Sequence, residues 1–398
     1  MEYKIPLVDL ARQYEAIAGE VQDAVLRVMA SARYIGGDEV ASFEEALAQF
    51  LGVAPQAVIS CASGTDALLI AYLTAGLQQG DEVIIPTHNY VAAAEAAALI
   101  GLVPVWADLP LLQEKDSRAS FQIDTDPNYL SQLCSPKTKA LVAVNMYGMP
   151  AVTPQLVSFC QENRLTLIED NAQGMGGMNW VDGKGVVPTG AQGDISTTSF
   201  FPTKPLGAMG DGGAVIVRNH TEWQKKAREI AQHGQEGRYQ YKRVGINSRL
   251  DALQAAILSV RLKYLPERIK RAQAIAQQYN DAFSQLEGVR IELPYGQELG
   301  TTSSYYQYAL WVAPDKREFL MQSLKSMGIE TRVYYPRLMH NEPVYAPLGF
   351  CRSHRGLSGA EEVHRGVLCL PIDPLQTSED TQFIIRQFTQ IYHTLCHL

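Results

Sequence analysis

The sequence has no apolar run of the ~20 unbroken residues that a membrane-spanning helix needs. Its most apolar stretch, residues 91–107, contains Glu95 and Pro104. The start, MEYKIPLVDLARQYEA, has too short an apolar run for a signal peptide. We therefore expect no membrane span, no secretory leader and no membrane partner.

Basic residues are too few for a protein that binds nucleic acid along its surface. Lys and Arg number 34 against 42 Asp and Glu, which leaves a net charge of −8. Binding nucleic acid irrespective of its sequence needs a basic surface. The composition argues against that class of partner, but it is compatible with a local basic pocket for a phosphorylated small molecule.

Motifs for zinc, disulfides and nucleotides are missing as well. The cysteines form no CxxC pair, which indicates free thiols in a reducing compartment, the cytoplasm. No GxGxxG follows a strand, and Gly183-Lys184 lacks the upstream glycine of a P-loop. Dinucleotide-binding and P-loop enzymes are therefore disfavoured. The six cysteines are Cys61, Cys134, Cys160, Cys351, Cys369 and Cys396.

The sequence does contain a regular alternation of short apolar runs with helical segments. Such runs predict strands buried on both faces, so the pattern indicates an α/β fold with a mostly parallel sheet. The expected strands lie within residues 57–61, 81–86, 103–108, 139–148, 164–174, 194–200 and 212–217, and the expected helices include 43–52, 63–76 and 95–101. Residues 109–120 have the composition of a surface loop.

The pattern changes near residue 250. Two helices are expected on either side of Pro266, because proline interrupts a helix. A βαβ-like tail follows. These elements are helices at 250–265 and 267–286, strands at 306–313 and 329–335, and a helix at 316–328. A chain of 398 residues suits two or three domains of ~100–200 residues. We expect a large domain over 1–250 and a small C-terminal domain over 251–398.

Lys204 is the first candidate for chemistry. It follows an apolar strand and lies between Pro202 and Pro205, which restrict the backbone. Desolvation at a strand end favours the neutral amine that a Schiff base requires. Ser199, five residues earlier, offers a hydroxyl to a phosphate. An exposed loop lysine would give the same pattern, and this segment does not decide between the two.

Three further segments carry weaker signals. A strand ends in Glu169-Asp170, where one carboxylate could support a protonated ring nitrogen, although both could cap the next turn. Residues 62–73 open a helix whose N–H groups suit an anion or a plain N-cap. Tyr90 could stack on a flat cofactor or be a half-buried aromatic. Together with Lys204, these are the parts that pyridoxal phosphate requires.

The sequence resembles the DegT/DnrJ/StrS family of pyridoxal-phosphate-dependent sugar aminotransferases, which have the aspartate aminotransferase-type fold, fold type I. The matching blocks run over most of the chain in the family's order. They are SGTDAL (63–68), IIPTHNYVA (84–92), NMYG (145–148), IEDNAQGMGG (168–177), GDISTTSFFPTKPLGAMGDGGAV (193–215), GINSRLDALQAAIL (245–258) and VYYPRLMH (333–340). The resemblance implies a large domain with a mostly parallel, seven-stranded-type sheet and a smaller α+β C-terminal domain.

The resemblance also implies a role for each matching residue. Lys204 would hold pyridoxal 5'-phosphate covalently as the internal aldimine and shuttle the proton, and Asp170 would keep the pyridine nitrogen protonated. The other cofactor contacts would be Gly64, Thr65 and Ser199 to the phosphate, Tyr90 and Gln173 to the ring, and Asn247 to the cofactor phosphate in the other subunit. The last contact implies a homodimer with shared active sites.

The implied reaction moves an amino group from glutamate to a keto group of a nucleotide-linked sugar, in amino-sugar biosynthesis for a polysaccharide or glycoconjugate. The block at 245–258 resembles members that act on 3-keto sugars, such as a 3-keto-6-deoxyhexose, more than 4-keto aminotransferases. A sensory or regulatory protein that binds the cofactor without turnover is the alternative. Substrate-side candidates are Tyr334, Tyr335 and His340, with Arg249, Arg332 and Arg337 as ligands for diphosphate or glutamate, or as surface salt bridges.

Overall fold

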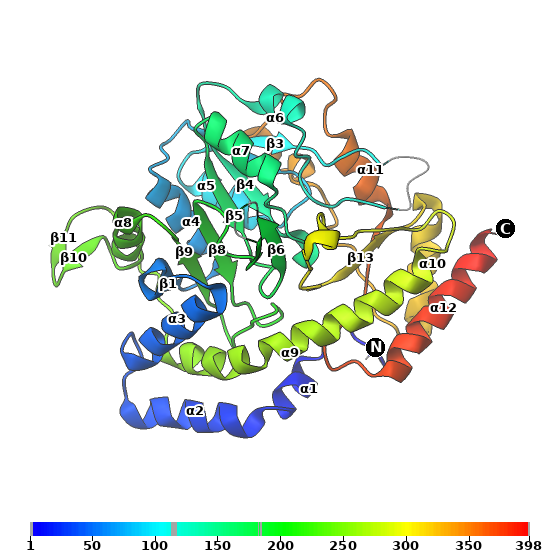
Figure 1. Cartoon of the computed structure of the whole chain (residues 1–398), viewed down its shortest axis with the longest axis horizontal. Coiled ribbons are helices and arrows are strands. Elements are labelled where there is room, and N and C mark those ends of the chain that lie inside the picture. Colours follow the sequence, from blue (N-terminus) through cyan, green and yellow to red (C-terminus); the bar gives the residue numbers. More distant parts are fainter. Residues whose placement is uncertain (1–2, 113–117, 182, 184, 397–398) are drawn as a thin grey trace.

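A computed structural model describes residues 3–112, 118–181, 183 and 185–396. Its centre is a seven-stranded sheet with the strand order β1-β9-β8-β5-β4-β2-β3 (Figure 1). In this sheet β9 runs antiparallel to β1 and β8, and the remaining neighbours pair in parallel. The strands are β1 (Val58–Cys61), β2 (Glu82–Pro86), β3 (Val103–Ala107), β4 (Thr138–Val144), β5 (Thr166–Asp170), β8 (Ile195–Ser199) and β9 (Gly213–Ile216). The mostly parallel α/β sheet expected from the sequence is confirmed.

The chain also forms helices and short 3₁₀ turns. The helices are α1 (Leu10–Glu15), α2 (Ala18–Ser31), α3 (Asp38–Leu51), α4 (Gly64–Ala75), α5 (Ala92–Leu99), α6 (Pro127–Leu133), α7 (Pro154–Glu162), α8 (Thr221–Ala231), α9 (Ala252–Phe283), α10 (Pro314–Ser326), α11 (Ser358–Gly366) and α12 (Ser378–Cys396). The 3₁₀ turns are η1 (Pro55–Ala57), η2 (Met146–Gly148), η3 (Gln297–Leu299), η4 (Met339–Asn341) and η5 (Ala346–Leu348).

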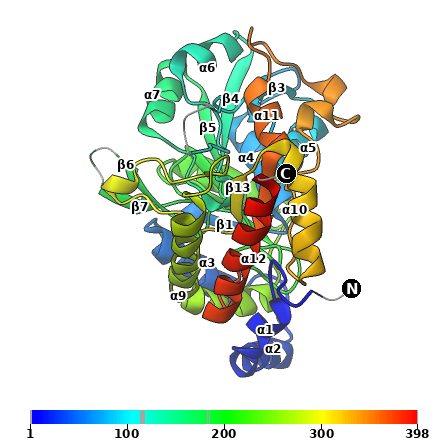
Figure 2. The same ribbon diagram turned by 90° about the vertical axis from the view of Figure 1, so that its right-hand side faces the viewer.

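Both faces of the sheet are covered. On one face α4 and α5 pack on strand residues such as Val83 and Val142, and on the other α6 and α7 pack on Ile84 and Leu141 (Figure 2). Consecutive strand residues point to opposite faces, and Val83 and Ile84 are both fully buried. This burial on two sides explains the unbroken apolar runs in the sequence.

One continuous helix, α9, replaces the two helices expected around Pro266, so that expectation is wrong. The helix runs from Ala252 to Phe283 with Pro266 inside it. A proline within a helix removes one N–H donor and costs about 3 kcal/mol. Here the first half of α9 packs against α2 and α3, and the second half packs in a separate C-terminal core. Packing on both sides of the proline outweighs its local cost.

The C-terminal core surrounds a three-stranded antiparallel sheet of β12 (Arg290–Ile291), β13 (Tyr308–Trp311) and β14 (Val367–Leu370). The strand expected at 329–335 is not formed. That segment makes isolated bridges, Ile329 with Ile5 and Arg332 with Cys369. Its partners lie on two different segments, so no continuous ladder develops. The division of the chain at residue 250 stays a prediction.

The surface loop expected over residues 109–120 is partly buried. Leu109 and Ala119 are inside the molecule, while Leu111 is exposed; residues 113–117 lie outside the described part of the chain. The backbone of Leu109 is covered by α11, because a β-carbon on Gly359 would lie 2.2 Å from Leu109 O. Contact with a distant helix therefore decides the burial of this loop.

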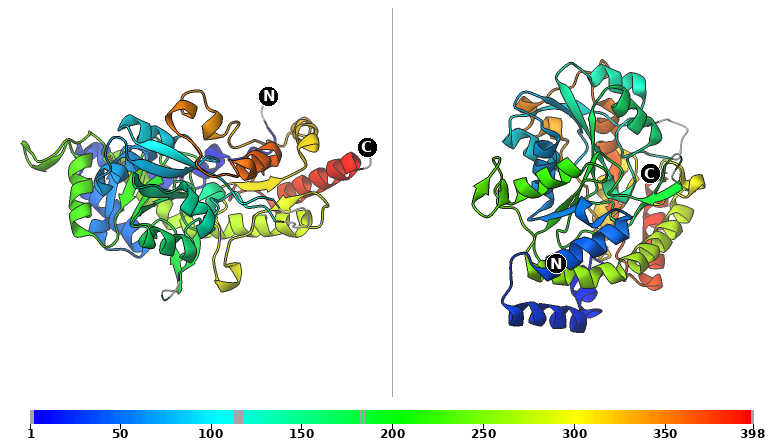
Figure 3. Two further views of the ribbon diagram at one scale, coloured as in Figure 1. Left: turned by 90° about the horizontal axis from the view of Figure 1, so that it is seen from above. Right: turned by 60° about the vertical axis from the view of Figure 1, so that its left-hand side comes forward.

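Two small hairpins stand outside the main sheets. One is formed by β6 (Met178–Val181) and β7 (Gly185–Pro188), and the other by β10 (Gln235–Gly237) and β11 (Gln240–Tyr241). The β10–β11 hairpin projects away from the body of the chain (Figures 1 and 3). Its tip and the segment after it carry large exposed side chains, Tyr239, Tyr241 and Val244.

Candidate active site

The carboxyl ends of the central strands bring several predicted cofactor residues together. β5 ends at Asp170 and β8 at Ser199, and these two strands are neighbours. Gly213 of β9 pairs with Ser199 on one side and with Cys61 of β1 on the other. Because β1 leads into α4, the start of that helix lies beside Ser199.

Gly64, the first residue of α4, is packed directly against Ser199. A β-carbon on Gly64 would lie 2.7 Å from Ser199 Cβ. Ser63 caps the helix by accepting a hydrogen bond from Asp66 N at 3.0 Å. The N–H groups of Gly64 and Thr65 have no partner within the helix, since the first turn lacks acceptors. These N–H groups and the Ser199 hydroxyl form a cradle for an anion.

Glu169 and Asp170 point to opposite faces of the sheet, as consecutive strand residues do. Glu169 is fully buried, and its carboxylate accepts hydrogen bonds from surrounding loops and from β8. The donors are Asn145 Nδ2, Gly190 N, Gln192 N and Ser196 Oγ. Asp170 Oδ1 accepts one from Ala172 N at 3.0 Å. Glu169 is thus a structural acceptor, and Asp170 is the carboxylate whose charge interacts with Lys204.

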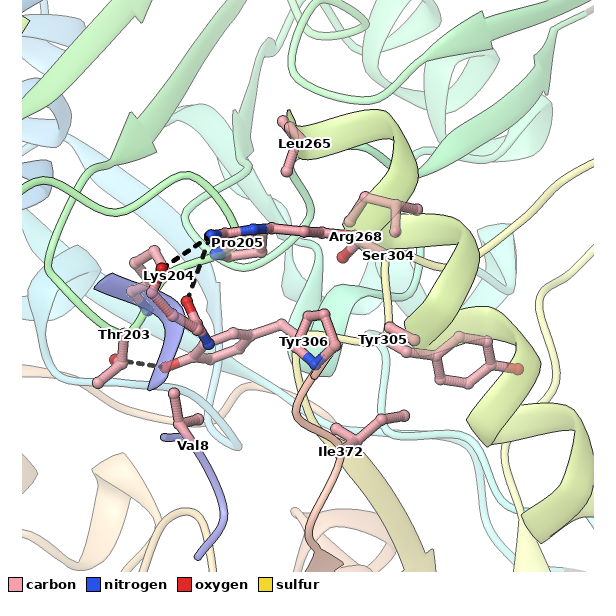
Figure 4. Close-up of a pocket in the computed structure, with 14 residues that line it drawn as sticks. Val8, Thr203, Lys204, Pro205, Leu265, Arg268, Ser304, Tyr305, Tyr306 and Ile372 are labelled. Atoms are coloured by element: carbon pink, nitrogen blue, oxygen red, sulfur yellow. Dashed lines mark hydrogen bonds between the residues drawn. The ribbon is translucent and has the colours of Figure 1, made fainter. Parts of the chain in front are cut away.

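Lys204 lies in the loop between β8 and β9 and is partly buried, so it is not an exposed loop lysine. Burial lowers the pKa of Lys204 to about 8, against the opposing effect of Asp170. Burial raises the pKa of Asp170, and the Ala172 hydrogen bond and Lys204 oppose that rise. Lys204 Nζ also lies 4.8 Å from the ring centre of Tyr306, whose hydroxyl is 3.1 Å from Thr203 Oγ1 (Figure 4).

Gln173 is held at both ends of its amide. Its Oε1 accepts a hydrogen bond from Tyr147 N at 2.7 Å, and its Nε2 donates to the Tyr335 hydroxyl at 3.2 Å. The ring of Tyr335 lies 5.4 Å from that of Tyr90, which is 51% exposed. The structure therefore joins Gln173, Tyr335 and Tyr90, and leaves Tyr90 half exposed to solvent.

Tyr147 is a residue of this site that the sequence prediction missed. Its hydroxyl lies 2.9 Å from His88 Nε2 and donates to Tyr334 O. Its backbone has a φ of 57°, which is uncommon for a residue other than glycine. Burial lowers the pKa of His88 to about 3, so this histidine is neutral at ordinary pH. The strand-end NMYG block was the available signal, but it does not reveal these contacts.

The candidates on the substrate side are more widely spread. His340 is partly buried next to the end of β2. Its Nδ1 lies 2.7 Å from the hydroxyl oxygen of Thr87, the residue that follows the strand. Arg332 forms an ion pair with Glu330 at 2.9 Å, and Arg337 forms one with Glu342 at 3.8 Å. Arg337 therefore has the surface partner that the sequence left as an alternative, whereas the partner of Arg332 is buried, since Glu330 is 8% exposed.

Asn247 and Arg249 lie on the segment that follows β11, and both are exposed. Ser248 between them donates to Asp66 Oδ2 at 2.6 Å and accepts from Ala62 N at 3.0 Å. These bonds hold the segment against the start of α4. The side chains of Asn247 and Arg249 are thereby presented at the surface near the anion cradle.

Membrane-spanning helices and metal sites are both absent from the described residues. None of the helices there is both long and apolar enough to cross a membrane. No group of three or more His, Cys, Asp or Glu side chains in that part of the chain is arranged to hold a metal ion. The six cysteines are free thiols.

The arrangement fits pyridoxal phosphate. The anion cradle suits the phosphate, the amine of Lys204 suits the carbonyl carbon, and Asp170 suits the ring nitrogen. The cradle follows β1, Asp170 ends β5 and Lys204 lies in the loop after β8, so all three are at the carboxyl edge of the sheet, where open α/β sheets bind their ligands. The contact between Gly64 and Ser199 keeps the cradle free of a side chain at its base.

Comparison with known proteins gives a consistent picture. The model of the DegT/DnrJ/EryC1/StrS aminotransferase family matches residues 15–389. The UDP-2-acetamido-2-deoxy-3-oxo-D-glucuronate aminotransferase of Pseudomonas aeruginosa is 36% identical over 97% of this chain and 99% of its own. A pleiotropic regulatory protein of Geobacillus stearothermophilus is 34% identical over 98% of each chain. The solved structure of NtdA from Bacillus subtilis with bound cofactor PMP has a TM-score of 0.85 and 26% identity, covering 99% of this chain and 86% of that one.

Proposed function

The chain belongs to the DegT/DnrJ/EryC1/StrS aminotransferase family, and we propose that it moves an amino group from glutamate to the 3-keto group of a nucleotide-linked sugar. It has the fold type I architecture of sugar aminotransferases. The observation that carries the proposal is that Lys204, Asp170 and the anion cradle at the start of α4 lie at one site of the same chain. The name of the Pseudomonas relative supports a 3-keto sugar over a 4-keto sugar.

Lys204 is the catalytic residue in this proposal. Bound pyridoxal phosphate supplies a conjugated ring that takes up the electron pair of the bond broken at the donor's α-carbon. Lys204 attaches the cofactor through Nζ and, once released, moves a proton at that nitrogen. With a pKa of about 8, about a tenth of the amine is neutral at pH 7. Burial of the side chain thus prepares the lysine for both tasks.

The neighbouring residues bind and orient the ring. The Asp170 carboxylate would keep the ring nitrogen of the cofactor protonated, because a negative charge nearby favours the positively charged form of that nitrogen. Tyr90 would stack on the cofactor ring, and the contact between Tyr90 and Tyr335 holds the Tyr90 side chain in position. Gln173 contacts the ring or its hydroxyl and is fixed by its own hydrogen bonds. Each of these side chains acts by position rather than by exchanging protons.

A cytoplasmic homodimer with shared active sites completes the proposal. The β10–β11 hairpin projects from the body with Tyr239 and Tyr241 exposed, and Val244 beyond it is 94% exposed. Large apolar side chains on a protruding segment support a surface that another subunit covers. Asn247 follows this segment and would reach the phosphate of the other subunit's cofactor. The free cysteines support a reducing compartment.

The test is turnover with a panel of nucleotide-linked 3-keto and 4-keto sugars, with glutamate as donor and product structures determined by NMR. The proposal expects a yellow protein, bleaching of its absorbance band by glutamate, and an amine at carbon 3. A product with the amine at carbon 4 would show that the enzyme is a 4-keto aminotransferase instead of a 3-keto aminotransferase. A protein that binds no pyridoxal phosphate would refute the whole function.

A regulatory role is the second candidate, because a relative of 34% identity is named as a pleiotropic regulatory protein. Such a protein would bind the cofactor and respond to glutamate without aminating any sugar of the panel. Lys204 and Asp170 at one site favour turnover, since a sensor does not need the proton-transfer step. The same panel therefore separates the two functions.

A further inference from the structure

Two arginines of α9 are buried beside the loop that carries Lys204. Arg261 and Arg268 are only 6% and 8% exposed. Arg261 Nη2 and Arg268 Nη1 both donate to Gln13 Oε1, at 3.0 and 3.3 Å. Arg261 Nη1 also donates to Gly207 O at 2.6 Å, within the Lys204 loop. Among the described residues, no carboxylate lies within 4.0 Å of either guanidinium.

The charge of this pair is incompletely balanced. The carboxylate of Asp373 acts electrostatically on both arginines. Its Oδ2 is occupied by Gln13 Nε2 at 2.7 Å and by Asp9 N at 2.9 Å. Burial, together with the charge of Arg268, lowers the pKa of Arg261 to about 10, although Asp373 opposes this. Two buried cations against one carboxylate create a demand for a further negative charge.

A small cavity adjoins Arg268 (Figure 4). Its lining includes Gln13, Lys204, Arg268, Ser304 and Tyr306. Its volume is about 40 Å³, and a single water needs roughly 10–15 Å³. Chloride, formate or acetate therefore fits this space.

We propose that Arg268, backed by Arg261 and Gln13, forms a binding site for a small monovalent anion, either a halide or a carboxylate. The anion accepts charge-assisted hydrogen bonds from guanidinium N–H groups that Gln13 does not use. Its neighbours come from α1, α9 and the Lys204 loop, so the bound anion ties these three segments together. In the alternative, the arginines only anchor α1 to α9 and the cavity holds water.

Bromide in crystals of the full-length protein tests the site directly. Data collected at the bromine absorption edge should show an anomalous peak within hydrogen-bond distance of the Arg268 guanidinium. Bromide peaks at the surface without one at Arg268 would overturn the proposal. This experiment uses the unmodified chain, so it does not depend on the folding of a variant.

Chloride binding in solution gives the second test, through the line width of the ³⁵Cl NMR signal. Arg268→Gln should weaken chloride binding at least about tenfold, because a charge-assisted hydrogen bond is lost. The control is Arg271→Gln, on the same helix, whose side chain is 53% exposed and pairs with Glu267 at 3.0 Å. The Arg271→Gln protein should broaden the ³⁵Cl signal as much as the wild type does. If the folded Arg268→Gln protein broadens the ³⁵Cl signal as much as the wild type, the proposal is overturned.

Acetate separates the two chemical sources of the anion. If added acetate narrows the chloride signal of the wild type and not of Arg268→Gln, the site takes carboxylates as well as halides. If the wild-type signal is unchanged, the site is specific for halides. In both cases the difference between the wild type and Arg268→Gln carries the assignment.

Discussion

Gly64 at the start of α4 is in contact with Ser199 at the end of β8. A β-carbon on Gly64 would lie 2.7 Å from Ser199 Cβ. The contact exists because Gly213 of β9 pairs with both β1 and β8. It places a helix N-terminus and a hydroxyl at one point, which is the arrangement that binds phosphate. The sheet topology thus builds the anion cradle from residues 135 positions apart in the chain.

Gly64→Ala should weaken binding of pyridoxal phosphate by about five- to 150-fold. The added methyl group must displace Ser199, and such overpacking costs about 1–3 kcal/mol. The apparent Kd, measured by absorbance titration of the apoenzyme, reports the change. Gly19→Ala is the matched control, because a β-carbon there meets nothing within 4 Å. Wild-type affinity in Gly64→Ala would show that the cradle does not hold the phosphate.

Mixing two inactive variants tests whether the active sites are shared between subunits. Lys204→Ala and Asn247→Ala each remove one part of the proposed composite site. In a mixed dimer one site then contains both changes and the other contains neither, so randomly mixed subunits should regain about a quarter of wild-type activity.

Lys204→Ala mixed with Asp170→Ala is the control for this experiment. Lys204 and Asp170 lie in the same subunit's site, so every site of the mixed dimer lacks one of them and activity should stay absent. Failure of the first mixture to exceed this control would contradict a site completed by Asn247 of the other subunit.

Glu292 gives a prediction for the pH dependence of stability. This carboxyl is 6% exposed, and burial raises its pKa to about 8 although Phe121 N and Gln122 donate to it. Between its ordinary value and pH 8 the folded state holds a proton that the unfolded state has released. The contribution of Glu292 to stability is therefore complete in acid and is lost as the pH rises toward 8.

Glu292→Gln cannot titrate, so its free energy of unfolding relative to the wild type should increase from pH 5 to pH 8 and level off above. Urea unfolding at pH 5, 7 and 9 measures this difference. Glu298→Gln, at an exposed position in the same region, should follow the wild type throughout. A difference between Glu292→Gln and the wild type that is constant with pH would rule out the protonated buried carboxyl.

Tyr147→Phe should destabilise the protein by about 1–3 kcal/mol, because His88 Nε2 and Tyr334 O lose a buried partner. Urea unfolding measures the loss. Tyr295→Phe is the control, since Tyr295 is 59% exposed and its hydroxyl accepts a hydrogen bond from Gln155 Nε2 at the surface; it should change stability by less than about 0.5 kcal/mol. Equal stabilities of the two variants would show that the Tyr147 hydroxyl does not join these segments.

The sequence predicts best where local pattern and burial agree. β2 and β3 appear within one residue of their expected limits, because runs such as Val83–Pro86 are buried on both faces. Pro266 misleads, since packing along the whole of α9 overrides its local effect. The segment 329–335 misleads because its partners, Ile5 and Cys369, lie on unrelated parts of the chain.

In the site, too, local sequence pattern does not predict features that depend on contacts between distant segments. Motif and family resemblance point to Lys204 and Asp170, whose roles stay predictions until the cofactor is seen on them. No local pattern reveals Tyr147, because its left-handed backbone and its buried hydroxyl depend on contacts 59 and 187 residues away. Equally, the ion pairs of Arg332 and Arg337 follow from side-chain geometry and not from sequence spacing.

Attachment of the cofactor to Lys204 is the central claim, and borohydride reduction tests it most directly. The wild type, incubated with pyridoxal phosphate, reduced and digested, should carry one phosphopyridoxyl group, located by mass spectrometry on the peptide that contains Lys204. Lys204→Ala should carry none. A wild type without the label, or a label confined to other lysines such as the exposed Lys263, would contradict the account.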